Sequence, residues 1–149
     1  MSGASVESEA LIRTPSRQVR RLGLHGVVGA VGRARDFTGG VLREWVWTDP
    51  EGIDPKGRER AEDILLVVSE LVANAMAHGA GVQEIAVTVD ERVLTVAVTD
   101  GEAAVPAPLP PGDPARPGGY GLHVVELLSR QWGTTCHASG KTVWAVFDC

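Results

Sequence analysis

Three polar side chains spaced four residues apart are the first candidates for chemistry in this sequence. Glu70, Asn74 and His78 lie within Asp63–Gly79, a stretch rich in Leu, Val, Ala and Met that has no proline and no glycine before its end. This composition predicts a helix that is apolar around most of its circumference and is therefore buried. At about 3.6 residues per turn, side chains four apart share one narrow stripe of such a helix.

A carboxylate and a carboxamide on a buried helix need partners, and two interpretations follow. In the ordinary one, neighbouring side chains or water satisfy them. In the other, the stripe lines a ligand cavity, with Glu70 as an acid or base and Asn74 as a neutral oxygen ligand one turn away. His78, at the end of the stretch, is interpreted as structural.

Length and composition limit the classes of protein to consider. With 149 residues, 44% hydrophobic and 22% charged, the chain is most simply one ordinary soluble globular domain. Its net charge of −5 argues against a general nucleic-acid binder. Cys136 and Cys149 form neither a zinc spacing nor a disulfide framework, which indicates a reducing cytoplasm. No stretch approaches the roughly 18 apolar residues of a membrane span.

The elements that must position these residues are expected on both sides of the central helix. Residues 1–21 are polar and predict a flexible N-terminal arm, and residues 22–149 predict the folded domain. Helical periodicity marks Val27–Trp47 and Leu122–Gln131 besides the central helix. Alternation predicts two hairpins, Gln83–Asp90 with Val93–Asp100 and Thr134–Ala138 with Thr142–Phe147. Helices and antiparallel strands in this order indicate an α+β fold.

The segment Gly101–Gly118 is so rich in proline that neither a helix nor a central strand can form there. A loop of this length is either a plain surface loop or a lid over a binding site. Glycines 118, 119 and 121 follow it directly before the helix expected from Leu122. Glycines at that place let backbone N–H groups approach an anion at the positive end of the helix.

These signals, in this order, resemble the Bergerat-fold ATP-binding domains shared by gyrase-type ATPases, MutL proteins and sensor histidine kinases. Among these, the chain is most similar to the small anti-sigma-factor serine/threonine kinases of bacteria. The matching segments are Glu70–His78 as the helix box, Val98–Gly101 and Gly119–Leu122 as two glycine boxes, and the ending Gly140–Phe147. The resemblance covers roughly residues 24–148. It implies a two-layer sandwich, with a mixed, mainly antiparallel sheet covered on one face by helices.

The resemblance also implies roles for individual residues. Asn74 would bind Mg²⁺ through its side-chain oxygen, Glu70 would be the general base, and Asp100 would accept a hydrogen bond from the adenine amino group. Further contacts with ATP would come from Gly101, Arg116, Gly119, Tyr120, Gly121 and Leu122, and Thr142 would assist adenine recognition through water. The proline-rich segment would close over the phosphates as a lid.

Two functions are compatible with these residues. One is an ATP- and Mg²⁺-dependent serine/threonine kinase that phosphorylates an anti-anti-sigma antagonist. The alternative is a non-catalytic nucleotide-binding module that sequesters a sigma factor or its antagonist. Retention of Glu70 and Asn74 favours the kinase. Two features favour the module. The first glycine box is altered and reads Asp100-Gly101-Glu102-Ala103-Ala104. The lid has only one basic residue, Arg116, although phosphate transfer depends on positive charge.

The resemblance further implies how the protein associates. A homodimer is expected, with contacts through the arm and the first helix, besides binding to the sigma factor or antagonist. No direct contact with nucleic acid or membrane is expected, and the expected location is cytoplasmic.

Overall fold

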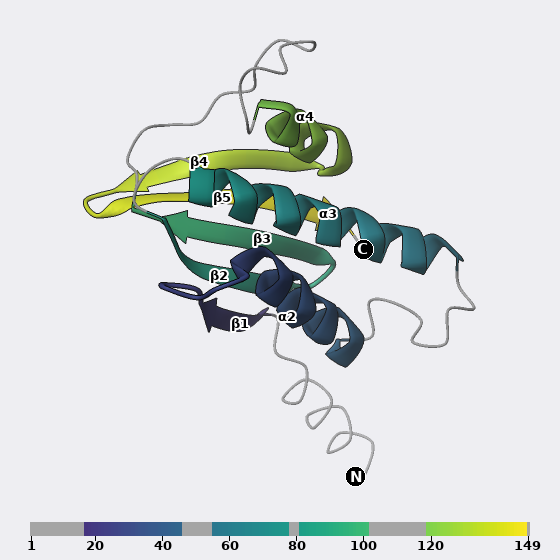
Figure 1. Cartoon of the computed structure of the whole chain (residues 1–149). Helices are drawn as coiled ribbons and strands as arrows, with labels where there is room; N and C mark the ends of the chain where they lie inside the picture. Colours follow the sequence, from purple (N-terminus) through teal and green to yellow (C-terminus); the bar gives the residue numbers. More distant parts are fainter. Residues whose placement is uncertain (1–16, 46–54, 78–80, 102–118, 149) are drawn as a thin grey trace, which may run out of the picture.

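Five strands form one sheet, and three helices cover one of its faces, in the part of the chain that the computed structural model describes (Figure 1). That part comprises residues 17–45, 55–77, 81–101 and 119–148. In chain order the elements are β1 (Arg17–Gly23), α2 (Ala30–Glu44), α3 (Pro55–Ala77), β2 (Val82–Asp90), β3 (Val93–Asp100), α4 (Gly119–Leu128), β4 (Gln131–His137) and β5 (Gly140–Asp148).

The sheet has the strand order β1-β2-β3-β5-β4, and each neighbouring pair is antiparallel. Both predicted hairpins are present as β2–β3 and β4–β5. The expected α+β sandwich with helices on one face is therefore confirmed. The sheet, expected to be mixed but mainly antiparallel, is antiparallel in every described pair.

Alternation along the strands builds the core between the two layers. Side chains of one parity face the helices and are buried, while those of the other parity lie on the uncovered face of the sheet. From the sheet the core receives Ile85, Val87, Leu94, Val96, Val98, Val143, Ala145 and Phe147, and from α3 it receives Ile64, Val67, Val68, Leu71, Val72 and Ala75. The alternation from which the strands were predicted thus separates the buried face of the sheet from the uncovered one.

Strand β1 corrects the expected boundary between arm and domain. Arg17–Gly23 pair with β2 along their whole length, so residues 17–21 belong to the sheet rather than to the arm. Arg20 and Arg21, which the expected arm included, form ion pairs with Glu44 and Glu84, respectively. An edge strand tolerates such charges because one of its sides faces solvent. Residues 1–16 lie outside the described residues.

Helix ends differ from those expected by a few residues. Helix α2 is shorter than the predicted Val27–Trp47, and α4 lies three residues earlier than the predicted Leu122–Gln131. The end of α4 has a local cause, because Arg130 N–H already donates to the carbonyl of Val146 at 2.8 Å. This bond begins the pairing of β4 with β5 and prevents the helix from continuing.

Helix α3 is the longest element, and its two halves differ in composition. Its first turns carry charged residues from Lys56 to Asp63, whereas its second half is largely apolar and buried. This second half packs between α2 and α4 over the sheet (Figure 1). None of the described helices combines the length and the hydropathy that crossing a membrane requires.

Gly140 allows β5 to begin directly against the end of β3. Its φ of 151° is one that side-chain-bearing residues rarely adopt, and an added Cβ would collide with the carbonyl oxygen of Asp100. We therefore expect Gly140→Ala to lower the free energy of unfolding by at least about 1–3 kcal/mol, measured by urea denaturation. Gly32→Ala, in open space on α2, is the control and is expected to be neutral or stabilising. Equal stabilities of the two variants would contradict this account of Gly140.

Candidate functional site

Asn74 is a buried polar residue in the apolar half of α3. Its side chain is only 4% exposed, and its Oδ1 finds no hydrogen-bond donor among the described residues. Burying an amide oxygen without a partner costs about 1–3 kcal/mol, so this oxygen is suited to receive a ligand. Glu70 lies one turn earlier and is partly exposed. The cavity interpretation of this stripe thus accounts for Asn74 better than the ordinary one.

Asp100 ends β3 on the face of the sheet that the helices cover. Lys141 lies directly opposite it on β5, and the ammonium Nζ is 3.1 Å from Asp100 Oδ1. Neither side chain is more than 1% exposed. Because desolvating two charges is expensive, a buried ion pair needs a reason other than stability alone. The carboxylate for which the resemblance implies base recognition is therefore part of a buried ion pair.

Lys141 is the residue of the site that sequence reasoning missed. It has the same parity as Val143, Ala145 and Phe147, which fill the core from β5. A lysine at an inward position of an otherwise apolar strand was the signal that could have revealed it.

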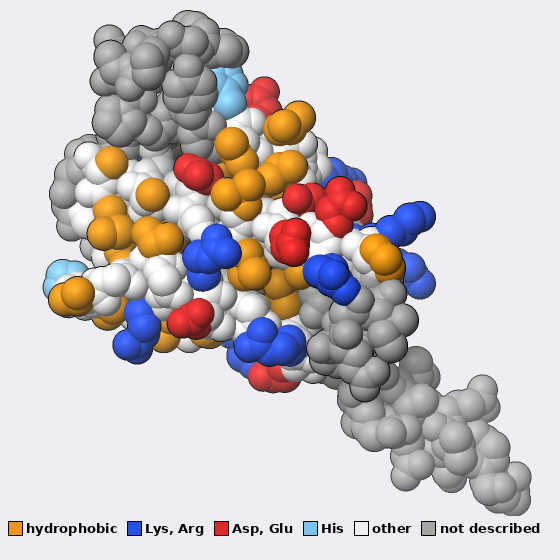
Figure 2. Space-filling view, turned by 45° about the vertical axis from the view of Figure 1, so that its right-hand side comes forward, with side chains coloured by type: hydrophobic (Ala, Val, Ile, Leu, Met, Phe, Trp, Pro, Cys, Tyr) orange, Lys and Arg blue, Asp and Glu red, His pale blue; other side chains and the backbone are white. Residues whose placement is uncertain are grey.

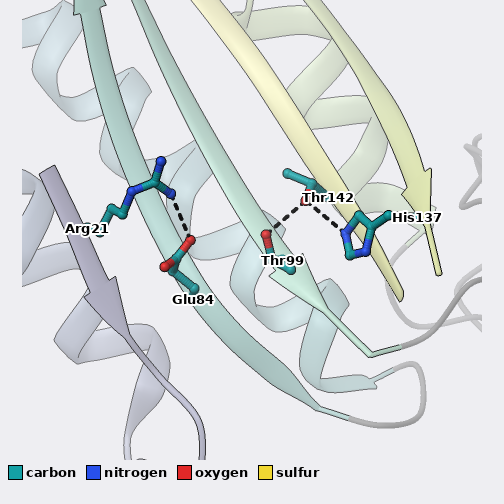
Figure 3. A network of polar contacts seen from close by, with 5 residues as sticks. All are labelled: Arg21, Glu84, Thr99, His137 and Thr142. Carbon is teal, nitrogen blue, oxygen red and sulfur yellow. Dashed lines mark hydrogen bonds and ion pairs between the residues drawn. The ribbon is translucent and has the colours of Figure 1, made fainter. Parts of the chain in front are cut away.

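Thr142 follows Lys141 on β5 and points to the opposite face of the sheet. Its side chain lies on the uncovered face, opposite to that of Asp100, where its Oγ1 is 2.8 Å from the Oγ1 of Thr99 and 3.4 Å from His137 Nε2 (Figure 3). Consecutive strand residues point to opposite faces, so Lys141 and Thr142 cannot both approach Asp100. The side chain next to Asp100 is therefore that of Lys141, and the assisting role of Thr142 in adenine recognition through water stays a prediction.

The second glycine box begins α4 instead of preceding it. Gly119, Tyr120, Gly121 and Leu122 are the first four residues of the helix. The first four N–H groups of a helix have no partner within it and carry the positive end of its dipole. Leu122 anchors this turn, because its side chain is buried in the core. The backbone of this turn is therefore suited to bind phosphate. The sequence analysis predicted the same function for these glycines, but it placed them before the helix rather than in its first turn.

The second half of α3, the end of β3 and the β4–β5 turn lie at the same end of the sheet (Figure 1). Helix α4 packs against α3 and starts toward this end. Gly101 follows β3 there, and its N–H donates to the carbonyl of Gly81 at 3.4 Å. Arg116 and the predicted proline-rich lid lie outside the described residues, as does His78.

A hollow of about 420 Å³ lies at the other end of α3, between Lys56, Asp63 and Arg130. Partial burial raises the pKa of Asp63, and the nearby acidic residues of α3 add to this rise. Acidic and basic side chains lie among hydrophobic ones over the helix-covered side of the described surface (Figure 2). None of the predicted site residues lines this hollow, so it is separate from the candidate site.

Residues 29–147 match the family of histidine kinase-like ATPase domains. This range spans more than half of the chain and contains Asn74, Asp100, Lys141 and the start of α4. The chain belongs to this family. No curated protein matches it. As a histidine kinase-like domain it has the Bergerat-type fold of ATP-binding proteins, so the recognition of that fold from the sequence is confirmed.

The site of this histidine kinase-like domain fits a cation that is bound only in part by protein. Among the described residues, no three His, Cys, Asp or Glu side chains lie together as a metal cluster. Mg²⁺ does not require one, because it usually keeps several waters and binds one or two protein oxygens together with substrate phosphates. The buried Oδ1 of Asn74 is an oxygen of the required kind.

Proposed function

We propose that the protein is an ATP-dependent serine/threonine kinase of the anti-sigma-factor type, whose substrate is an anti-anti-sigma antagonist. The observation that carries this proposal is the pair of Glu70 and Asn74 on α3, one turn apart, in a histidine kinase-like ATPase domain. The finer assignment, from ATP-binding domain to kinase, is supported by the resemblance of the helix and glycine boxes to these small kinases.

Asn74 and Glu70 would have separate tasks in this reaction. Asn74 would hold Mg²⁺ through Oδ1, and the ion would neutralise charge on the phosphates of ATP. Glu70, partly exposed, would accept the proton of the attacking hydroxyl group of the partner protein. A buried metal ligand and an accessible base are consistent with the different burial of these two side chains.

The two ends of the nucleotide would be held by different elements. Asp100 would accept a hydrogen bond from the base, with Gly101 allowing close approach after the strand. The first-turn N–H groups of α4, from Gly119 to Leu122, would bind the phosphates. In the proposed site, the side chain of Asp100 recognises the base, and backbone N–H groups bind the negatively charged phosphates.

A non-catalytic nucleotide-binding module is the second candidate, and the ion pair of Asp100 with Lys141 favours it. A carboxylate that already accepts a charge-assisted hydrogen bond offers less to a base than one without such a partner. Such a protein would sequester a sigma factor or antagonist without transferring phosphate. The two candidates differ in one measurable quantity, phosphate transfer to the partner protein.

Assembly with other proteins completes the proposal. A sigma factor or its antagonist would be the partner and a second copy would form a homodimer, as the resemblance to anti-sigma-factor kinases implies. Exposed apolar side chains are available for such contacts outside the site, among them Val28 before α2 and Leu127 on α4. Incubation with labelled ATP and candidate antagonist proteins, followed by detection of labelled serine or threonine, tests the kinase directly.

Asn74→Leu is expected to weaken nucleotide binding without lowering the stability of the protein. Among the described residues this amide oxygen has no donor, so its removal should leave the free energy of unfolding unchanged or raise it by up to about 1–3 kcal/mol. The same change removes the proposed metal ligand, so the affinity for ATP in the presence of Mg²⁺ should fall at least about tenfold. Calorimetric titration and urea denaturation measure the two effects. Unchanged affinity in a stable variant would exclude Asn74 as the ligand.

A further inference from the structure

The sheet has one face that no described helix covers, because all three described helices lie on the other face (Figure 1). Alternation along each strand places every second side chain on this uncovered face. Its centre is uncharged and combines small, β-branched and aromatic side chains of the three inner strands, namely Ala86, Thr88, Thr95, Ala97, Trp144 and Val146. A contiguous surface of this composition is typical of a site that binds another protein.

Trp144 makes the centre of the uncovered face flat. Its ring lies against Gly133 on the neighbouring strand β4, where an added Cβ would be 2.5 Å from the ring atom Cζ2. The indole therefore lies across β4, and a glycine at this position leaves room for it. Packed sheets lie about 10 Å apart and interdigitate their side chains, so they require flat faces with some hollows. A hollow of about 520 Å³ lies at one corner, lined by Arg17, Thr88, Asp90, Glu91, Val93 and Thr95.

The charged side chains of the uncovered face lie on its edge strand or near strand ends, and both signs occur. They are Arg17 and Arg21 of β1, Glu84 and Asp90 of β2, and Asp148 of β5. Arg21 is paired with Glu84 (Figure 3), Asp148 is paired with Arg130, and Arg17 lies opposite Asp90 in the strand register. Because interface centres are depleted of charge, the uncovered face can pack against a copy of itself without burying unpaired ions.

The first described helix is a poorer surface for contact between two copies. Its exposed side carries charged residues, Arg33, Arg35, Asp36, Arg43 and Glu44. A symmetric contact centred there would desolvate these charges and bring like charges of the two copies together. The expected arm contributes differently, since its residues 17–21 form β1. Val19 of this strand pairs with Thr88 and therefore lies on the uncovered face.

The size of the uncovered face is sufficient for a specific interface. A sheet of five strands, each of 7–9 residues, measures about 20–25 Å in each direction. Two such faces packed together bury on the order of 1,000 Å² in total, which is the area that a specific interface needs.

We propose that a second copy of this chain packs on the uncovered face of the sheet, so that the two sheets form the homodimer interface. This inference rests on the homodimer of the proposed function and specifies its contact surface. Asn74 and Asp100 lie on the helix-covered side of the sheet. Both ATP sites of the dimer therefore face away from the interface and stay accessible to a partner protein.

Sedimentation of the full chain tests this proposal with two variants that each add one arginine per copy. Ala97→Arg places the charge at the centre of the uncovered face, where solvent surrounds it in a monomer. In the dimer the two copies bring like charges into one interface, so the dissociation constant should rise at least about tenfold. Gly32→Arg, in open space on the exposed side of α2, is the matched control and should sediment as the wild type does.

Hydroxyl-radical labelling of the wild type gives a second measurement that does not depend on the folding of a variant. Trp144 should be oxidised less at concentrations where the dimer forms than in the monomer. Met76, which is 49% exposed on α3, is the internal reference and should be oxidised equally in both states.

A wild type that sediments as a monomer even at about 1 mM overturns the proposal. A dimer that folded Ala97→Arg leaves intact, dissociation by Gly32→Arg, or equal labelling of Trp144 in monomer and dimer also overturns it. Titration with ATP and Mg²⁺ separates these results from a failure of the proposed function, because Ala97→Arg changes the face opposite to the ATP site and should keep the wild-type affinity. Absence of ATP binding in the wild type would refute the ATP site whatever the oligomeric state.

Discussion

Replacement of Glu70 by Gln is expected to leave ATP affinity nearly unchanged and to lower the rate of phosphate transfer about 10²–10⁴-fold. Gln has the shape of Glu and can still donate and accept hydrogen bonds, but it cannot take the proton of the attacking hydroxyl. Glu70 is partly exposed, so its replacement leaves the core of α3 undisturbed. The measurement is labelled phosphate transferred to a partner serine or threonine, beside ATP affinity by calorimetry.

Glu62→Gln is the matched control for this experiment. Glu62 is exposed and lies about two turns earlier on the same helix. Its replacement by Gln changes the net charge by the same amount as Glu70→Gln. Its transfer rate should equal that of the wild type. A wild type that binds ATP and its partner yet transfers no phosphate would favour the sequestering module over the kinase. Transfer by Glu70→Gln at the wild-type rate would mean that another group is the base.

Much of the fold could be predicted because it depends on local periodicity. The apolar stretch around Glu70 and Asn74 is long enough to indicate a helix, and the alternation in β2 and β3 places Val96 and Val98 on the buried face. The ordered set of helix box and glycine boxes then identified the ATP-binding fold. These features lie within single elements, where sequence spacing alone decides which side chains share a face.

Features that depend on pairing between distant segments were not predicted. Strand β1 has no clear alternation, and its arginines resemble a solvated arm until β2 supplies the backbone partners and Glu84 an opposite charge. The contact between Lys141 and Asp100 likewise depends on the register between β3 and β5. A shift of one residue would bring Thr142 to the helix-covered face instead. The resemblance therefore led to a proposed base-binding role for Asp100, but it gave no sign that this carboxylate is paired with Lys141.

The ion pair of Asp100 and Lys141 should show strong thermodynamic coupling. Both side chains are almost fully buried, so Lys141→Met leaves a carboxylate in the core without its ammonium. We expect this change to lower the free energy of unfolding by about 3–5 kcal/mol, as for other broken buried pairs. Asp100→Asn keeps the shape of the side chain and removes the other charge, so it should also be destabilising.

The double variant, Asp100→Asn with Lys141→Met, should be more stable than the sum of the single losses predicts. With both charges removed, the core no longer holds an uncompensated ion, and a neutral pair of similar volume costs little. Urea denaturation of the wild type, the two single variants and the double variant gives the coupling free energy, expected to be at least about 1–3 kcal/mol. Strictly additive losses would show that the two charges do not depend on each other in the folded protein. Strong coupling would instead mean that every substitution at Lys141 changes the state of the carboxylate that is proposed to read the base.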